Sequence, residues 1–168
     1  HYFSQVVDLN RKIPRGMWVQ AQLQRHKNMN LEAGDSLMSN AFFIKFLENR
    51  ENRPYLGNIY HAWANLKLNQ NLTDEAEALY QESLKVPSSD AVLKARNYEA
   101  IGNLKFDQTL FREAGAYYDS TLTVMVRDTK PFRKVQRKRD NLDEVIFYET
   151  QLAQNDSILS LASLSKKE

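Results

Sequence analysis

Apolar side chains recur at spacings of three and four residues along most of this chain, which is the period of an amphipathic helix. The pattern contains no strand-like alternation, and only five glycines and four prolines interrupt 168 residues. We therefore expect an all-α protein, built as a succession of helices joined by short turns.

The strongest pattern runs from Tyr60 to Val86, because it occurs again 38 residues later, from Tyr98 to Val124. Thirteen of the 27 aligned positions are identical, against roughly two expected from ordinary residue frequencies. A fixed period of this length is typical of helical solenoids, in which each repeat buries its apolar face against its neighbours.

Each copy contains two helical patterns and a short polar break, so we expect residues 57–86 and 95–124 to form matching helix pairs. Small side chains at equivalent positions allow antiparallel helices to approach to about 8–10 Å. These are Ala64 and Gly102 in the first helices, and Ala76 and Ala114 in the second helices. Thr73 is expected to cap a second helix, with Asp74 and Glu75 at its positive end.

This pattern resembles the tetratricopeptide repeat (TPR), which places aromatic, small and alanine residues at fixed positions of two helices. The matching residues are Tyr60, Trp63, Ala64, Ala76, Tyr80 and Ser83 in the first copy, and Tyr98, Ile101, Gly102, Ala114, Tyr118 and Thr121 in the second. Lys67 and Lys105 depart from it, because the family usually has an aromatic there. The resemblance implies a TPR-like right-handed solenoid of helical hairpins.

The rest of the chain is divided around these repeats. Residues 54–128 are assigned to two TPR-like repeats, 57–90 and 95–128, and residues 1–53 to one or more degenerate N-terminal helical hairpins. In the N-terminal part, the expected apolar faces are Met17, Trp18, Ala21 and Leu23, then Leu37, Ala41, Phe42, Ile44, Phe46 and Leu47, with a turn at Asn28-Met29-Asn30.

Residues 129–168 are expected to hold a long C-terminal capping helix, from Phe132 to about Ala153, and a short final helix. Asn155 and Asp156 are expected to cap that short helix, which would run from Ser157 to about Leu164.

Short runs in the C-terminal two thirds resemble the SprE/PorW family of the Bacteroidetes type IX secretion and gliding machinery. The runs are Ala116-Tyr117-Tyr118-Asp119-Ser120, Lys138-Arg139-Asp140-Asn141-Leu142 and Asn155-Asp156-Ser157-Ile158-Leu159, and the similarity spans roughly Pro54 to Lys167. The resemblance implies a TPR-built lipoprotein on the periplasmic face of the outer membrane, with its anchoring cysteine upstream of this segment.

The function implied is a non-enzymatic protein–protein interaction scaffold, an accessory component of type IX secretion or gliding motility. Its partners would be other proteins of that apparatus. The alternative class is a peptide-binding TPR adaptor or chaperone-like protein unrelated to secretion. A helical hydrolase domain is the least favoured class.

Composition narrows the chemistry further. A net charge of +2 is too small to favour nucleic acid, and the chain has no cysteine. No apolar run approaches the roughly 18 residues of a membrane span, so direct membrane insertion of this segment is not expected. His1, His26 and His61 lack metal-ligand spacing, and no phosphate-binding loop or nucleophile motif occurs. We expect no catalytic residue, no cofactor and no metal.

Two binding surfaces follow from the repeats. If the hairpins are TPR-like, their first helices line a groove at Asn58, His61, Asn65, Leu68, Asn69, Arg96, Glu99, Asn103, Phe106 and Asp107. Asparagine can pair with the backbone of an extended peptide, although a solvated face is the plain alternative. His61 and Glu99 stand where carboxylate-binding TPR domains carry lysine, so the pattern does not favour capture of a C-terminal carboxylate.

The secondary surface is basic and comprises Arg133, Lys134, Arg137 and Lys138. Asp140, Asp143 and Glu144 follow within two turns and offset this charge. That favours a solvated helix face, or contact with a partner protein, over nucleic acid.

Overall fold

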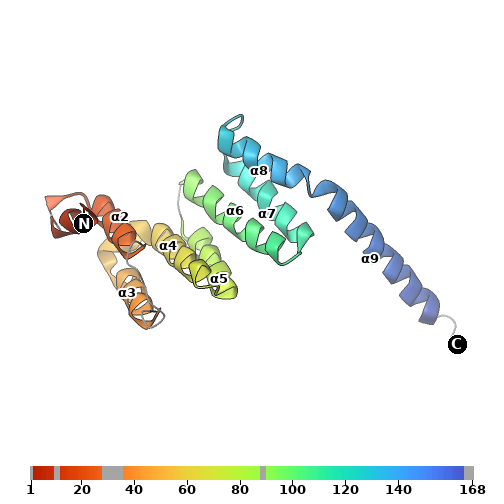
Figure 1. The fold of residues 1–168 in the computed structure, drawn as a ribbon, viewed down its shortest axis with the longest axis horizontal. Helices are drawn as coiled ribbons and strands as arrows, with labels where there is room; N and C mark the ends of the chain where they lie inside the picture. The colour runs from red at the N-terminus through yellow and green to blue at the C-terminus, as the bar shows by residue number, and fades with distance from the viewer. Residues whose placement is uncertain (1, 10–11, 28–35, 88–89, 165–168) are drawn as a thin grey trace. The chain divides into compact units, whose positions relative to one another are not determined.

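The computed structural model describes residues 2–9, 12–27, 36–87 and 90–164. The chain divides into two compact units, His1–Asn97 and Tyr98–Glu168, which are described separately below. Within the described ranges every regular element is a helix and no strand occurs (Figure 1), so the all-α prediction is confirmed. The expected turn at residues 28–30 lies outside the described residues.

The first unit holds most of the helices. Its elements are α1 (Tyr2–Asp8), α2 (Arg15–Lys27), α3 (Ser36–Glu48), the 3₁₀ helix η2 (Arg50–Tyr55), α4 (Leu56–Asn69), α5 (Thr73–Lys85) and the first part of α6 (Ala91–Asp107). The second unit contains the rest of α6, then α7 (Phe111–Val124), α8 (Lys130–Asp140) and α9 (Asp143–Leu164). Both predicted pairs of helices are present: α4 packs against α5, and Figure 1 shows the two side by side. Helices α6 and α7 are joined by the Tyr118–Asn103 and Lys105–Glu113 contacts.

The core of the first unit is aromatic and lies between α2, α3 and α4. Phe43 is buried there, and its ring stacks on Trp63 with the centroids 5.5 Å apart. Ile44 and Met17, which were predicted to face the core, are 48% and 57% exposed, so that assignment was wrong. Ser39, Phe43 and Phe46 are buried at spacings of four and three residues, and this face leaves Ile44 outside.

The two helix pairs share the same internal contacts. In the first pair the Tyr80 hydroxyl donates a hydrogen bond to Asn65 Oδ1 at 3.0 Å. In the second the Tyr118 hydroxyl donates to Asn103 Oδ1, also at 3.0 Å. Two lysines at equivalent positions form ion pairs with the following helix, Lys67 with Glu75 at 2.7 Å and Lys105 with Glu113 at 3.4 Å. Identical residues therefore make equivalent contacts in both copies.

The turn inside each pair is a Schellman motif, in which a left-handed residue ends the first helix. Asn71 has a φ of 60° and Thr109, its equivalent, has a φ of 62°. Past each of them, the Leu72 N–H bonds to the Lys67 carbonyl at 3.0 Å and the Leu110 N–H to the Lys105 carbonyl at 2.9 Å. The turn therefore fixes the direction in which the second helix departs.

We expect Thr109→Asn to stabilise the protein by about 1 kcal/mol, because asparagine tolerates the left-handed region that penalises a β-branched side chain. The reciprocal change, Asn71→Thr, should destabilise by a similar amount. Urea unfolding midpoints measure both. If Thr109→Asn lowers the midpoint, strain at this turn is not the cost assigned to it.

The prediction that Thr73 caps the second helix of the first pair was wrong. Helix α5 has Leu72 at its N-cap position, with no side-chain capping bond, and Thr73 is already helical. The reason is the tight preceding turn, because the Leu72 carbonyl accepts the Ala76 N–H and starts the helix one residue early.

The prediction of a single long capping helix was also wrong, since α8 ends at Asp140 and α9 begins at Asp143. Leu142 explains the break: it is 2% exposed in a cluster with Ala114 and Val135, and its carbonyl accepts the first α9 bond, from the Ile146 N–H. The separate short helix does not form, because α9 continues to Leu164.

Candidate functional site

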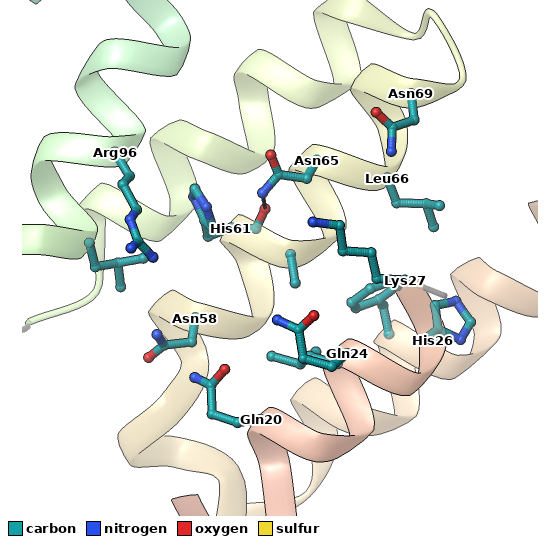
Figure 2. A pocket seen from close by; sticks show the side chains of 14 residues that line it. Gln20, Gln24, His26, Lys27, Asn58, His61, Asn65, Leu66, Asn69 and Arg96 are labelled. Atoms are coloured by element: carbon teal, nitrogen blue, oxygen red, sulfur yellow. Dashed lines mark hydrogen bonds between the residues drawn. The ribbon is translucent and has the colours of Figure 1, made fainter. Parts of the chain in front are cut away.

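A cavity of about 370 Å³ opens in the first unit, where α2 and α4 face each other (Figure 2). Its walls come from α2, α3, α4 and the start of α6. The described residues that line it are Gln20, Leu23, Gln24, His26, Lys27, Phe43, Asn58, His61, Ala62, Asn65, Leu66, Asn69, Leu93 and Arg96. The structure thus brings together five residues of the predicted groove and leaves Leu68 out of the lining; the five are Asn58, His61, Asn65, Asn69 and Arg96.

Two polar stripes, one on α4 and one on α2, contribute six of the described lining residues. On α4, Asn58, Asn65 and Asn69 lie at spacings of seven and four residues, which keeps them on one helix face. On α2, Gln20, Gln24 and Lys27 do the same at spacings of four and three. Sequence reasoning missed the α2 stripe, although that helical spacing of polar residues was its visible signal.

His61 is held at the cavity by a chain of buried hydrogen bonds. Its Nδ1 lies 2.6 Å from Oδ1 of Asn97, a residue that is fully buried. The Asn97 amide nitrogen donates to Ser83 Oγ at 2.7 Å, and that hydroxyl donates to the Gly57 carbonyl at 2.7 Å. Because the amide nitrogen is committed to Ser83, Oδ1 is the acceptor and Nδ1 of His61 carries the proton.

Burial lowers the pKa of His61 below its ordinary value of 6.5. The hydrogen bond to Asn97 raises this pKa in part, and the positive charges of Arg96 and Lys27 lower it again. The Tyr80 ring packs beside it, with the two ring centroids 5.6 Å apart. The imidazole is therefore favoured in its neutral form between two cations.

We expect this depressed pKa to make stability fall as the pH drops below 6.5. The unfolded chain then binds a proton that folded His61 takes up only at lower pH, so the His61 contribution is present above pH 6.5. His61→Asn should flatten the difference in urea midpoint between pH 7.5 and pH 5.5. The pKa of His26 is also lowered, mainly by burial and then by the charge of Arg25. His26→Asn is therefore the matched variant. An unchanged pH profile in His61→Asn would contradict this assignment.

Asn65 serves the hairpin as well as the cavity. Its amide nitrogen donates to the His61 carbonyl at 2.7 Å, while its Oδ1 accepts the Tyr80 hydroxyl. The predicted pairing of Asn65 with a peptide backbone stays a prediction, and any such contact would compete with these two bonds. The side chains of Asn58 and Asn69 make no hydrogen bond within the described part of the chain and are the readier contacts.

The described lining of the cavity carries positive charge and includes no acidic residue. Lys27 and Arg96 are both exposed, and neither forms an ion pair with a described residue. None of the described lining residues carries a carboxylate. The apolar part of the lining comes from Leu23, Phe43, Leu66 and Leu93.

The remaining predicted groove residues lie in the second unit. Lys138 of α8 forms an ion pair with Glu99 at 2.9 Å and donates to Asn103 Oδ1 at 2.8 Å. Phe106 is 46% exposed and its ring packs edge-on against Phe111. In this unit, therefore, α8 itself contacts the residues predicted to meet a partner.

The ion pair between Lys138 and Glu99 removes one residue from the predicted basic surface. Arg133, Lys134 and Arg137 are exposed on α8, whereas Lys138 is turned towards Glu99. Three of the four predicted basic residues thus remain accessible.

Among the described residues, no cluster of three histidine, aspartate or glutamate side chains is placed to hold a metal ion. None of the helices in those ranges is both long enough and apolar enough to cross a membrane. The chain matches no protein-family model, and no curated protein is similar enough to count as a relative.

Proposed function

We propose that this chain is a non-enzymatic protein-interaction scaffold whose first unit docks a polypeptide segment in the cavity between α2 and α4. The observation that carries the proposal is the pair of amide-bearing stripes that face each other there. Each side-chain amide offers both a donor and an acceptor, which is what the backbone of an extended peptide requires.

The proposal is supported by a difference between the residues of α4 that are buried and those that line the cavity. Ile59 and Ala64 of α4, with Ala76 and Tyr80 of α5, are completely buried and hold the helices together. Asn58 and Asn69 stand on the cavity side, and Asn69 is exposed. Packing therefore does not require the amides, and they are free to serve recognition.

The finer form of the fold that we propose is a TPR-like right-handed solenoid, in which the two hairpins are successive repeats. Its support is the 38-residue repeat together with the shared tyrosine–asparagine and lysine–glutamate contacts. Solenoid repeats present extended surfaces that their own folding does not need.

We further propose a role in type IX secretion or gliding motility, as part of a lipoprotein at the periplasmic face of the outer membrane. The SprE/PorW resemblance supports this, through runs such as Ala116–Ser120 and Lys138–Leu142. The partners would be proteins of that apparatus. The alternative, a TPR adaptor unrelated to secretion, is favoured if the full gene lacks a signal peptide with a lipid-attachment cysteine.

The test is a crosslinking pull-down of the full-length protein from its own host, with secretion assayed in parallel. Asn58→Ala combined with Asn69→Ala should reduce both partner recovery and secretion. The matched control alters the other surface, Arg133→Glu combined with Arg137→Glu, and should leave both readouts near normal. Circular dichroism checks that each variant is folded.

The opposite pattern of results would contradict docking in the cavity. If the amide variant leaves recovery and secretion intact while the α8 variant removes both, the cavity is not the docking site and the basic surface is.

A further inference from the structure

We infer that the cavity selects a polypeptide segment that carries acidic side chains in its middle. This inference rests on the proposed function and adds the chemistry of the segment to it. The observation behind it is the arrangement of Lys27, His61 and Arg96, three nitrogen-bearing groups from three different helices that line one cavity.

The charges of the lining point to an anion. Arg96 and Lys27 both act electrostatically on the His61 ring, so each charge lies within electrostatic reach of that ring. Neither is offset by an ion pair with a described residue, and the described lining contains no carboxylate. A carboxylate that enters beside His61 would be attracted by both cations, and a hydrogen bond to either one would be charge-assisted.

The cations come from α2 and from the start of α6. These are not the positions at which the family resemblance would place a carboxylate-binding lysine, where this chain has His61 and Glu99. The acidic preference is therefore a property of how α2 packs in this unit.

The amides favour the interior of a segment over its C-terminal carboxylate. Figure 2 shows Asn58 and Gln20 on one side of the cavity and Asn69 on the other, with Lys27, His61 and Asn65 between them. Asn58 and Asn69 are eleven residues apart on α4, which corresponds to about 16 Å. Five extended residues span that length at about 3.3 Å each, so a chain could continue past the cations in both directions.

The apolar residues of the lining predict which side chains accompany the acidic ones in the bound segment. Leu66 and Leu93 line the cavity together with Phe43, which is almost completely buried. Alternate side chains of an extended segment point in opposite directions. A sequence that alternates leucine with glutamate therefore presents its leucines on one side of the extended segment and its carboxylates on the other.

The probe is a fluorescent hexapeptide that alternates leucine with glutamate, acetylated and amidated at its ends, with anisotropy measured on the whole chain. We expect it to bind at least about tenfold more tightly than the same peptide with glutamine in place of glutamate. Raising the salt from about 50 mM to 500 mM should shrink this advantage, because exposed ion pairs are screened. Lys27→Met combined with Arg96→Met should abolish it.

The matched control removes two exposed cations of the same unit that do not line the cavity, by Lys45→Met combined with Arg53→Met. It should retain the preference for glutamate. A third probe, the glutamine peptide with a free C-terminal carboxylate, should bind no better than its amidated form. If this third probe binds best, the cavity recognises a chain end and the inference is wrong.

Equal binding of the glutamate and glutamine peptides would overturn the inference without touching the proposed function, provided that Asn58→Ala with Asn69→Ala weakens both. If neither amide substitution affects any peptide and the pull-down is also unchanged, the proposed docking itself fails. The two failures are thus distinguishable.

Discussion

Replacing Ala114 by arginine is expected to lower the free energy of unfolding by about 3 kcal/mol or more. Ala114 on α7 has no exposed surface, and it belongs to the cluster formed by Tyr118, Val135 and Leu142. A larger side chain would separate α7 from α8, and its charge would lose hydration without gaining a partner. Both effects act in the same direction.

Urea unfolding of the two purified proteins measures this loss. The matched control is Gln108→Arg, which places the same side chain in the exposed turn before α7 and should change stability by less than about 0.5 kcal/mol. Near-equal midpoints for the two arginine variants would show that Ala114 is not at a close helix contact.

The repeat could be predicted because the same residues recur where the same contacts are needed. Tyr80 and Tyr118 each bond an asparagine fifteen positions earlier, and the lysine–glutamate pairs also recur. A residue that is kept in both copies is therefore recognisable from the sequence alone. Lys67, which stands where the resemblance to the TPR pattern leads us to expect an aromatic side chain, is 3% exposed and ion-paired.

Features set by tertiary contact could not be predicted. Residues 132–153 have good helical periodicity throughout, with no glycine or proline at the break. The helix stops because burial of Leu142 beside Val135 outweighs the continuation of one regular helix. Similarly, Thr109 is a poor choice for a left-handed turn, and only the preceding copy, with Asn71, hints at that conformation.

The candidate site was predictable on α4 and not on α2. Asn58, His61 and Asn65 belong to the repeat, so their common face followed from the period. Gln24 and Lys27 lie in the non-repeating part of the chain, and their position depends on how α2 packs against α4. No periodicity encodes that packing, and the positive charge of the cavity became visible only in three dimensions.

The packing of α2 depends on a second buried contact, made by Asn52 of η2. This residue is fully buried, and its Oδ1 accepts from Nε and Nη2 of Arg15 at 2.9 and 2.7 Å. Its amide nitrogen donates to the Phe46 carbonyl at 2.7 Å. One side chain thus joins the start of α2 to the end of α3. The Arg15 guanidinium also covers the Trp18 ring, 4.1 Å from its centroid, and pairs with Glu51 at 3.0 Å.

Asn52→Ala should therefore cost about 3 kcal/mol of unfolding free energy, because it leaves a backbone carbonyl and a partly buried guanidinium without their partner. The control is Asn49→Ala, which removes only an exposed capping bond to the Glu51 N–H and should cost about 1 kcal/mol. Urea midpoints compare the two. If Asn52→Ala costs no more than the cap, water replaces the amide and this contact does not hold α2.

If it costs as predicted, the peptide probe should also bind the Asn52→Ala variant more weakly than the parent, at a temperature where both are folded. The reason is that Lys27 and Gln24 reach the cavity only when α2 is held.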